Sequence, residues 1–422
     1  MMKSIAIIGT GIAGMACGHF LHPRYDLTVY ERNDYAGGHT NTVLVSEEGR
    51  TIPVDTGFMV YNEVTYPELT KLLAALNVET KPTSMSFSVQ HVPSGLEFCG
   101  SGLNGLFAQR KNLVKPRFWK LLWEINRFNA EAPKILDDPK YEDYSLKTYA
   151  EEMGFSREFL DKYLIPMSSA VWSTPADTML DFPAVTLVRF FKNHGFLGLD
   201  TQHPWRTVTG GSRMYRDKII RPFRDRLFVN RPAVRVSRQN GKAQVTDKSG
   251  QTVEYDGVIF ASHGDETLAL LADPTPREQA LLSPFRYEKN IATLHTDASV
   301  MPRTRAAWSS WNYRSELNRR GESVASTIYW MNSLQGVSDK HDYFVSINDP
   351  GRIQPLKIIQ TIDYTHPIFS VDAIRAQKEL PQLNENGVTY FCGSYFRYGF
   401  HEDALISAIA VCKKLGVEST QV

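Results

Sequence analysis

The sequence predicts an α/β protein with a parallel sheet that begins at the N-terminus and a second domain of mixed α+β structure. Three observations support this prediction. The apolar run Ser4–Ile8 leads directly into the turn GTGIAG and a helix-compatible segment, 12–21. A second apolar run, 27–30, ends on an acid, Glu31. The chain has 422 residues, more than one hydrophobic core usually serves.

The glycines of the first turn indicate whether this opening segment is a secretion signal or a turn that binds a phosphate. They break the apolar run, and a secretion signal needs an unbroken apolar helix. Gly9 suits the tight turn, Gly11 lets the backbone approach a pyrophosphate, and Gly14 lets the helix pack closely on the sheet. The N–H groups at the helix start, at Ile12 and Ala13, suit a phosphate. Glu31, 20 residues after Gly11, suits ribose hydroxyls, so the segment predicts a Rossmann-like dinucleotide site.

A second GxGxxG pattern, 100–105, does not predict another such site. The run before it is a poor strand, and no strand ending on an acid follows about 20 residues later. We interpret it as a turn before a helix. The sequence therefore predicts one dinucleotide site.

Composition narrows the class of protein. The net charge of +1 gives no reason to expect a nucleic-acid partner. The four cysteines are far apart, without metal-ligand spacing, so we expect no metal and a reducing, cytoplasmic compartment. There is no apolar run of about 18 residues that would span a membrane.

The residues after Glu31 identify the nucleotide. Arg32 and the run Gly37-Gly38-His39-Thr40 resemble the flavin amine oxidase and phytoene desaturase superfamily, in which this stretch wraps the FAD pyrophosphate. Segments 54–58, 231–236, 255–262, 388–394 and 399–404 match the superfamily in the same order. The resemblance implies a glutathione-reductase-type FAD-binding domain with an inserted α+β substrate domain. It also implies that FAD contacts Gly57, Phe58, Val234, Ser262, Gly393 and Ser394, besides the residues named above.

This chain departs from the superfamily at two of these positions. His39 stands where an arginine is usual, and Ser394 stands where an acid is usual. No cysteine occupies the place used for covalent attachment in some members, so we expect FAD to be held non-covalently.

The matched segments also predict the domain organisation. They assign 1–65, 205–265 and 385–422 to a discontinuous FAD-binding domain, and 66–204 and 266–384 to a substrate-binding domain. The last helix would begin near Glu402, Asp403 and Ala404, with its N-terminus toward the flavin N1–C2=O edge, where charge develops on reduction. The alternative is that these acids only favour the first turn of a helix.

Candidate substrate and catalytic residues are less well defined. Two aromatic clusters predict a wall of the substrate pocket containing Trp311, Asn312, Tyr329 and Trp330, although core packing would also explain such aromatics. Lys289 stands near the position where superfamily amine oxidases hold a water at flavin N5. His295 has a pKa range that suits a general base. The alternatives are an exposed lysine and a core histidine.

The segment 106–128 combines six Lys/Arg residues with Phe118, Trp119 and Trp123. A helix starting at Pro116 would have an apolar face next to basic residues, which suits the surface of an anionic membrane. Packing of that helix on its own domain is the alternative.

These observations predict an FAD-dependent oxidoreductase that moves a hydride from an apolar substrate to flavin N5. The chain is similar to a bacterial subgroup associated with the modification of membrane-lipid acyl chains, so a lipid acyl chain is the preferred substrate. A flavin amine oxidase for small amines, an FAD-dependent isomerase and a non-catalytic FAD-binding partner protein remain alternatives. Contact with the inner membrane surface would occur through 106–128.

Overall fold

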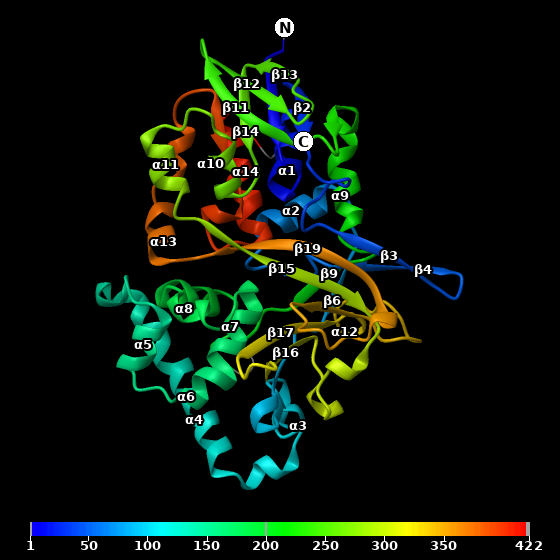
Figure 1. The fold of residues 1–422 in the computed structure, drawn as a ribbon, viewed down its shortest axis with the longest axis vertical. Coiled ribbons are helices and arrows are strands. Elements are labelled where there is room, and N and C mark those ends of the chain that lie inside the picture. The colour runs from blue at the N-terminus through cyan, green and yellow to red at the C-terminus, as the bar shows by residue number, and fades with distance from the viewer. Residues whose placement is uncertain (1, 199–200, 419–422) are drawn as a thin grey trace.

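A computed structural model describes residues 2–198 and 201–418. The molecule is elongated, with a parallel sheet at the end that holds the N- and C-termini and a mixed sheet with a helical region at the other end (Figure 1). The predicted α/β class, with a Rossmann-like domain and a second domain of mixed sheet and helices, is confirmed.

The parallel sheet has the strand order β10-β2-β1-β14-β20. Its strands are β1 (Ser4–Ile8), β2 (Asp26–Tyr30), β10 (Leu227–Phe228), β14 (Gly257–Phe260) and β20 (Thr389–Phe391). Helices α1 (Ile12–Leu21) and α14 (His401–Lys414) pack together on it, and most residues of β1 and β14 are buried. Because all strand pairs are parallel, the turns that follow β1, β2, β14 and β20 meet at one edge of the sheet.

The second domain is built on a seven-stranded mixed sheet with the order β19-β15-β18-β17-β16-β7-β8. Only β16 and β7 run parallel within it. Its strands are β7 (Phe87–His91), β8 (Leu96–Cys99), β15 (Arg286–His295), β16 (Trp311–Leu317), β17 (Ser323–Trp330), β18 (Phe344–Ile347) and β19 (Ile358–Ile368). The long strands β15 and β19 pass between the two halves of the molecule (Figure 1).

Helices cover the outer parts of this domain. They are α3 (Gly102–Leu106), α4 (Pro116–Glu131), α5 (Leu146–Glu152), α6 (Arg157–Phe159), α7 (Ile165–Trp172) and α8 (Ala184–Asn193). The second GxGxxG pattern begins with a bend at Gly100 and Ser101 and continues as the first four residues of α3, and in the described chain no dinucleotide-type strand follows it. Helix α4 begins at Pro116, as the sequence indicates.

Three smaller sheets complete the fold, and one of them, a meander, lies against the parallel sheet (Figure 1). The meander contains β11 (Ala233–Gln239), β12 (Lys242–Asp247) and β13 (Thr252–Tyr255), and two small sheets contain β3 (Thr42–Glu47), β4 (Arg50–Asp55), β5 (Tyr61–Asn62), β6 (Thr80–Thr83) and β9 (Trp205–Val208). The remaining helices are α2 (Pro67–Ala75), α9 (Arg213–Ile220), α10 (Gly264–Leu270), α11 (Pro276–Leu282), α12 (Met331–Gln335) and α13 (Val371–Gln377).

The strands of the two large sheets come from the segments that the sequence assigns to the two domains. Four helices do not follow this assignment. Helices α2, α11 and α13 fall in the segments assigned to substrate binding, and α10 crosses the predicted boundary at residue 265, yet all four lie with the parallel-sheet half (Figure 1). Helix α2 contacts α14, and α10 contacts β11. The sequence motifs mark the strands and turns that contact a nucleotide, and they carry no signal for the helices that cover those strands. In the described part of the chain, no helix has the length and apolarity needed to cross a bilayer.

Candidate functional site: a cavity shared by two domains

A cavity of about 690 Å³ lies between the parallel-sheet half and the mixed sheet. Both halves supply its walls. The turns after β1, β2, β14 and β20 line one end, and side chains from α7, α8, β16 and β17 line the other. The cavity therefore starts at the carboxyl edge of the parallel sheet, where dinucleotides bind in folds of this type.

The glycine turn is shaped by its contacts with the backbone. Gly9 has φ +98°, and a Cβ there would lie 2.8 Å from the carbonyl oxygen of Ala261. A Cβ on Gly14 would lie 1.9 Å from the carbonyl oxygen of Gly9. A Cβ on Gly11 would meet no protein atom within 4 Å, although Gly11 lines the cavity. The turn thus requires glycine at positions 9 and 14, while the space beside Gly11 is open to a ligand.

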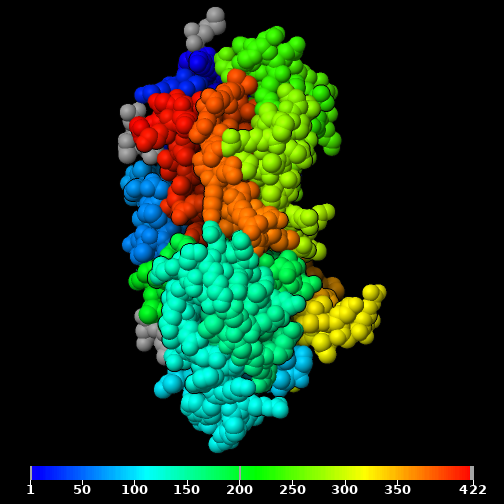
Figure 2. Space-filling model, turned by 90° about the vertical axis from the view of Figure 1, so that its left-hand side faces the viewer, coloured from blue at the N-terminus to red at the C-terminus, as the bar shows by residue number. Residues whose placement is uncertain are grey.

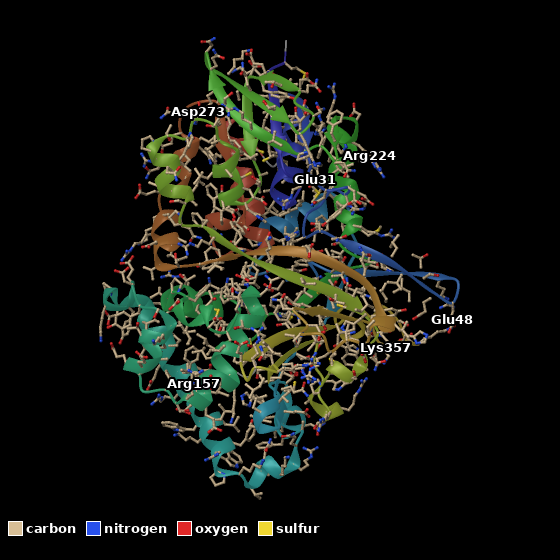
Figure 3. The ribbon with its side chains drawn as sticks, in the orientation of Figure 1. Glu31, Glu48, Arg157, Arg224, Asp273 and Lys357 are labelled. Carbon is tan, nitrogen blue, oxygen red and sulfur yellow. The ribbon has the colours of Figure 1, made fainter. Side chains whose placement is uncertain are left out.

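Glu31 holds this turn from the end of β2, in the upper half of the molecule (Figure 3). Its carboxylate accepts hydrogen bonds from the backbone N–H of Thr10 at 3.0 Å, from the Thr10 hydroxyl, and from the backbone N–H of Asn33 at 2.9 Å. The side chain is buried and lines the cavity. Glu31 therefore braces the turn as well as facing the nucleotide end of the cavity.

Most of the predicted cofactor residues line this cavity. They are Gly9, Gly11, Ile12, Ala13, Glu31, Arg32, Gly38, His39, Gly57, Phe58, Val234, Ser262, Gly393, Ser394 and Ala404. The described lining residues do not include Gly14, Gly37, Thr40, Glu402 or Asp403. Gly14 lies behind the turn, and the Thr40 hydroxyl bonds to Tyr215 at 2.8 Å and to His401 at 3.1 Å.

The two acids at the start of α14 have structural partners. Asp403 accepts a hydrogen bond from the backbone N–H of Phe400 at 2.9 Å and so caps its own helix. Glu402 accepts from the backbone N–H groups of Glu68 at 2.8 Å and Leu69 at 2.9 Å, which lie in the first turn of α2. Their carboxylates thus fix helix ends, while Ala404, Phe400 and His401 present the start of α14 to the cavity.

Replacing Glu402 with alanine should lower the free energy of unfolding by about 2–3 kcal/mol, because one buried and one half-buried N–H group of α2 lose their acceptor. Urea unfolding followed by circular dichroism measures this change. Glu402→Gln keeps an acceptor oxygen and should lose less than half as much. Equal losses in both variants would mean that the charge of Glu402, rather than its hydrogen bonds, stabilises the fold.

Four histidines gather where the two halves meet: His39, His263, His366 and His401. The His39 ring stacks on Tyr364 with centroids 4.6 Å apart and meets the His366 ring edge-on at 5.0 Å. The His401 ring stacks on Phe58 at 3.9 Å. Burial lowers the pKa of His366 to about 4 and that of His401 to about 3. Burial and the neighbouring histidines together lower the pKa of His39 well below its usual range, so these three rings are neutral at pH 7.

A chain of amide hydrogen bonds determines which nitrogen of His366 carries the proton. The backbone N–H of Ile291 donates to Asn348 Oδ1 at 2.9 Å, which makes Nδ2 of Asn348 the donor to Asn290 Oδ1 at 2.6 Å. Asn290 Nδ2 then donates to His366 Nδ1 at 2.9 Å. A neutral imidazole whose Nδ1 accepts carries its proton on Nε2. His366 is therefore an Nε2–H donor at the wall of the cavity.

Asn290→Asp should raise the pKa of His366 by at least about one unit, because a carboxylate next to Nδ1 stabilises the imidazolium. The ring nitrogens of selectively labelled histidine report this directly in an NMR pH titration. The unsubstituted protein should show the neutral Nε2–H form from pH 6 to pH 8. Asn290→Leu, which removes the hydrogen bond without adding charge, is the control and should not raise the pKa.

The two predicted catalytic residues lie away from the cavity. The described residues that line it include neither Lys289 nor His295. Lys289 is exposed, whereas the next residue, Asn290, is buried, because successive side chains of β15 point to opposite faces of the sheet. His295 is buried, with Nε2 at 2.8 Å from the Ser346 hydroxyl and Nδ1 accepting from the backbone N–H of Asp297 at 3.0 Å. Both ring nitrogens are thus occupied within the protein, as in a core histidine.

Two of the four residues predicted for the substrate wall line the cavity. Trp311 and Tyr329 line the cavity and meet edge-on with centroids 5.2 Å apart. Asn312 is buried away from it, where its amide bonds to Ser309 and Ile328, and Trp330 donates to Asp342 at 2.7 Å. Alternation along β16 and β17 explains the division, since neighbouring side chains lie on opposite faces. The sequence offered no signal for other members of this wall: Tyr66, Met85, Val171, Trp172, Ser173, Phe190, Phe196 and Trp205.

The cavity fits FAD in its chemistry. The open space at Gly11, the N-terminus of α1 and the buried Glu31 suit a pyrophosphate and a ribose. His39 Nε2 is buried without a hydrogen-bond partner in the described protein, where the superfamily usually has arginine. Among the described lining residues there is no cysteine, since Cys17, Cys99, Cys392 and Cys412 lie elsewhere. FAD held non-covalently is therefore the cofactor.

The fold and this cavity define an FAD-dependent oxidoreductase. The sequence profile described as "Flavin containing amine oxidoreductase" matches residues 12–296, and the chain belongs to this family. A comparison with curated protein sequences found no match.

Solved structures show the same fold at low sequence identity. Cyclohexylamine oxidase from Brevibacterium oxydans IH-35A matches with TM-score 0.70 and 15% identity, over 99% of this chain and 100% of that chain. A CLA-producing fatty acid isomerase from P. acnes matches with TM-score 0.66 and 14% identity, over 98% and 99% of the two chains. Putrescine oxidase bound to putrescine matches with TM-score 0.66 and 13% identity, over 99% of each chain.

Proposed function

We propose that this oxidoreductase removes a hydride from an apolar substrate, with a lipid acyl chain as the preferred class. The observation that carries the proposal is the lining of the substrate end of the cavity. The described side chains there include no Asp, Glu, Lys or Arg; the acids of the lining, Glu31 and Glu266, and its only cation, Arg32, belong to the nucleotide end. A charged substrate would lose its hydration there without gaining a partner of opposite charge.

The residues of the chain would orient the substrate and exclude water. When bound, FAD supplies the two-electron acceptor, which takes a hydride at N5. The aromatic walls formed by Trp172, Trp311 and Tyr329 would hold an apolar chain next to this acceptor and keep the site dry. The N-terminus of α14 would stabilise negative charge that develops at the nearby edge of the ring system. Neutral His366 would donate a hydrogen bond from Nε2 into the cavity, and it would add no positive charge there.

A small amine is the second candidate substrate. Trp311 and Tyr329 both line the cavity, and aromatic rings of this kind attract an ammonium group. Isomerisation of a double bond without net oxidation is a third candidate, because an apolar cavity beside a flavin would serve that reaction equally well.

Anaerobic reduction of the bound flavin tests the proposal. Acyl lipids should bleach the visible flavin bands, whereas cyclohexylamine and putrescine should not. Val171→Trp, which fills the substrate end, should slow bleaching at least about tenfold while FAD content stays unchanged. Met214→Trp, at an exposed position, is the matched control. Bleaching by amines alone would select the second candidate, and altered double bonds without bleaching would select the third. FAD-loaded protein that does none of these would overturn the enzymatic proposal.

A further inference from the structure

A second feature of the molecule is an exposed apolar surface far from the parallel sheet. It comprises Leu103 of α3, Leu113 and Val114 of the short helical turn Arg110–Val114, and Trp119 and Trp123 of α4; we call it the α3–α4 surface. Their exposed fractions are 76%, 48%, 83%, 51% and 58%. Segregation of so many large apolar side chains on one exposed segment is unusual for a protein surface that faces only water.

Contacts beneath the α3–α4 surface hold Trp119 and anchor α4. The Trp119 indole N–H donates to the Leu113 carbonyl oxygen at 2.8 Å, and its ring lies 5.5 Å from that of Phe107. Phe118 is buried and anchors α4 from its inner side. Trp119 is therefore held in place, so that little of its conformational entropy would be lost when another surface covers it.

The charged side chains of the same segment are all positive. Residues 101–123 contain five basic residues and no Asp or Glu: Arg110, Lys111, Lys115, Arg117 and Lys120. All five are exposed, and the described residues provide no ion pair to any of them. Since the whole chain has a net charge of only +1, this is a local concentration of positive charge.

We propose that the α3–α4 surface binds an anionic lipid bilayer peripherally. Basic side chains beside exposed tryptophans are the features that hold a protein at such a surface. Leu103 and Val114, the most exposed of the group, gain from an apolar medium but cannot stack on bases, which disfavours nucleic acid. A second copy of the chain would bring two positive surfaces together, which disfavours self-association.

The position of the surface in the molecule suits this role. Helices α3 and α4 form the end of the long axis opposite the chain termini (Figure 1). In the space-filling view, the segment coloured cyan, which includes α4, forms the rounded lower end of the molecule (Figure 2). A protruding, convex end can touch a flat bilayer without contact by the rest of the protein. The inference stands on this surface alone and does not depend on the substrate of the cavity.

Sedimentation of the full FAD-loaded chain with lipid vesicles tests the proposal. Vesicles of phosphatidylcholine with one quarter phosphatidylglycerol should bind the protein at low salt, and 0.5 M NaCl should release it, because screening weakens the attraction. Pure phosphatidylcholine vesicles should bind at least about tenfold more weakly. No binding to the anionic vesicles at low salt would overturn the proposal.

Variants locate the contact. Lys115→Glu/Lys120→Glu should weaken binding to anionic vesicles at least about tenfold. Leu103→Ser/Val114→Ser should weaken it severalfold without disturbing the core, since both side chains are exposed. Lys413→Glu/Lys414→Glu, exposed at the end of α14, and Leu356→Ser, fully exposed, are matched controls and should bind normally.

The remaining outcomes separate the competing interpretations. Normal binding by the α3–α4 variants would place the contact elsewhere and overturn the proposal, as would tighter binding to oligo(dT) than to vesicles. Flavin absorbance and circular dichroism check that each variant is folded. Because vesicle binding is measured without turnover, failure of this inference leaves the proposed function standing, and the reverse also holds.

Discussion

Replacing Gly11 with valine is expected to abolish FAD binding and leave the fold intact. Gly11 precedes α1 with φ −57° and ψ 176°, which any residue can adopt, and a Cβ there meets no protein atom within 4 Å. The added methyl groups would occupy the part of the cavity that a pyrophosphate needs. Steric overlap of this kind costs about 3 kcal/mol or more, so FAD affinity should fall at least about a hundredfold.

Flavin absorbance of the purified variant and titration of the apoprotein with FAD measure this effect, and circular dichroism reports the fold. Gly14→Ala provides the contrast: its Cβ would collide with the Gly9 backbone, so it should destabilise the turn itself. Gly100→Ala, in the other GxGxxG pattern, is the neutral control, because its nearest atom lies 3.9 Å away. Normal FAD binding by Gly11→Val would exclude the turn after β1 as the pyrophosphate site.

The second large effect is a pH dependence of stability that comes from Asp403. Burial raises the pKa of this carboxyl from 3.8 to about 7 in the folded protein. The folded state therefore keeps a proton that the unfolded state releases near pH 4. As pH rises from about 4 to 7, unfolding is favoured progressively, and the stability lost by pH 8 amounts to about 4 kcal/mol at 1.36 kcal/mol per pKa unit.

Asp403→Asn removes this titration while its amide oxygen can still accept from the Phe400 N–H group. The difference in unfolding free energy between Asp403→Asn and the unsubstituted protein should therefore grow in favour of the variant from pH 4 to pH 8. Urea unfolding at a series of pH values measures it. Asp372→Asn, in the exposed first turn of α13, is the control and should follow the unsubstituted protein. Parallel curves for Asp403→Asn would mean that Asp403 stays ionised when buried.

Most residues that the sequence assigns to the nucleotide line one end of the cavity, because backbone geometry determines that end. Gly9 and Gly14 are required by contacts under 3 Å with other backbone atoms, so the residue type itself carries the information. The substrate end depends instead on which face of a strand a side chain occupies. A shift of one residue separates Lys289 from Asn290, and Asn312 from Trp311, and periodicity cannot decide between such neighbours.

Other parts of the site could not be predicted, because they arise only from tertiary contacts. His366 is paired with Asn290 across two strands, and His401 meets Tyr215 from another segment at 2.8 Å. The sequence assigns Glu402 to the cofactor because it lies at the start of α14, yet its carboxylate accepts hydrogen bonds from the backbone of α2. No local pattern records these partners, since each pair is separated by many residues along the chain.

The interleaved strand order of the parallel sheet has a consequence for biosynthesis. Strand β1 pairs with β14, and β14 pairs with β20, so the sheet gathers chain segments near residues 5, 260 and 390. A nascent chain on the ribosome would hold the glycine turn and Glu31 long before β20 and α14 have been translated. Because the start of α14 lines the cavity, we expect tight capture of the flavin only after α14 has left the ribosome, and earlier nascent chains would expose unpaired strand edges that a chaperone can recognise.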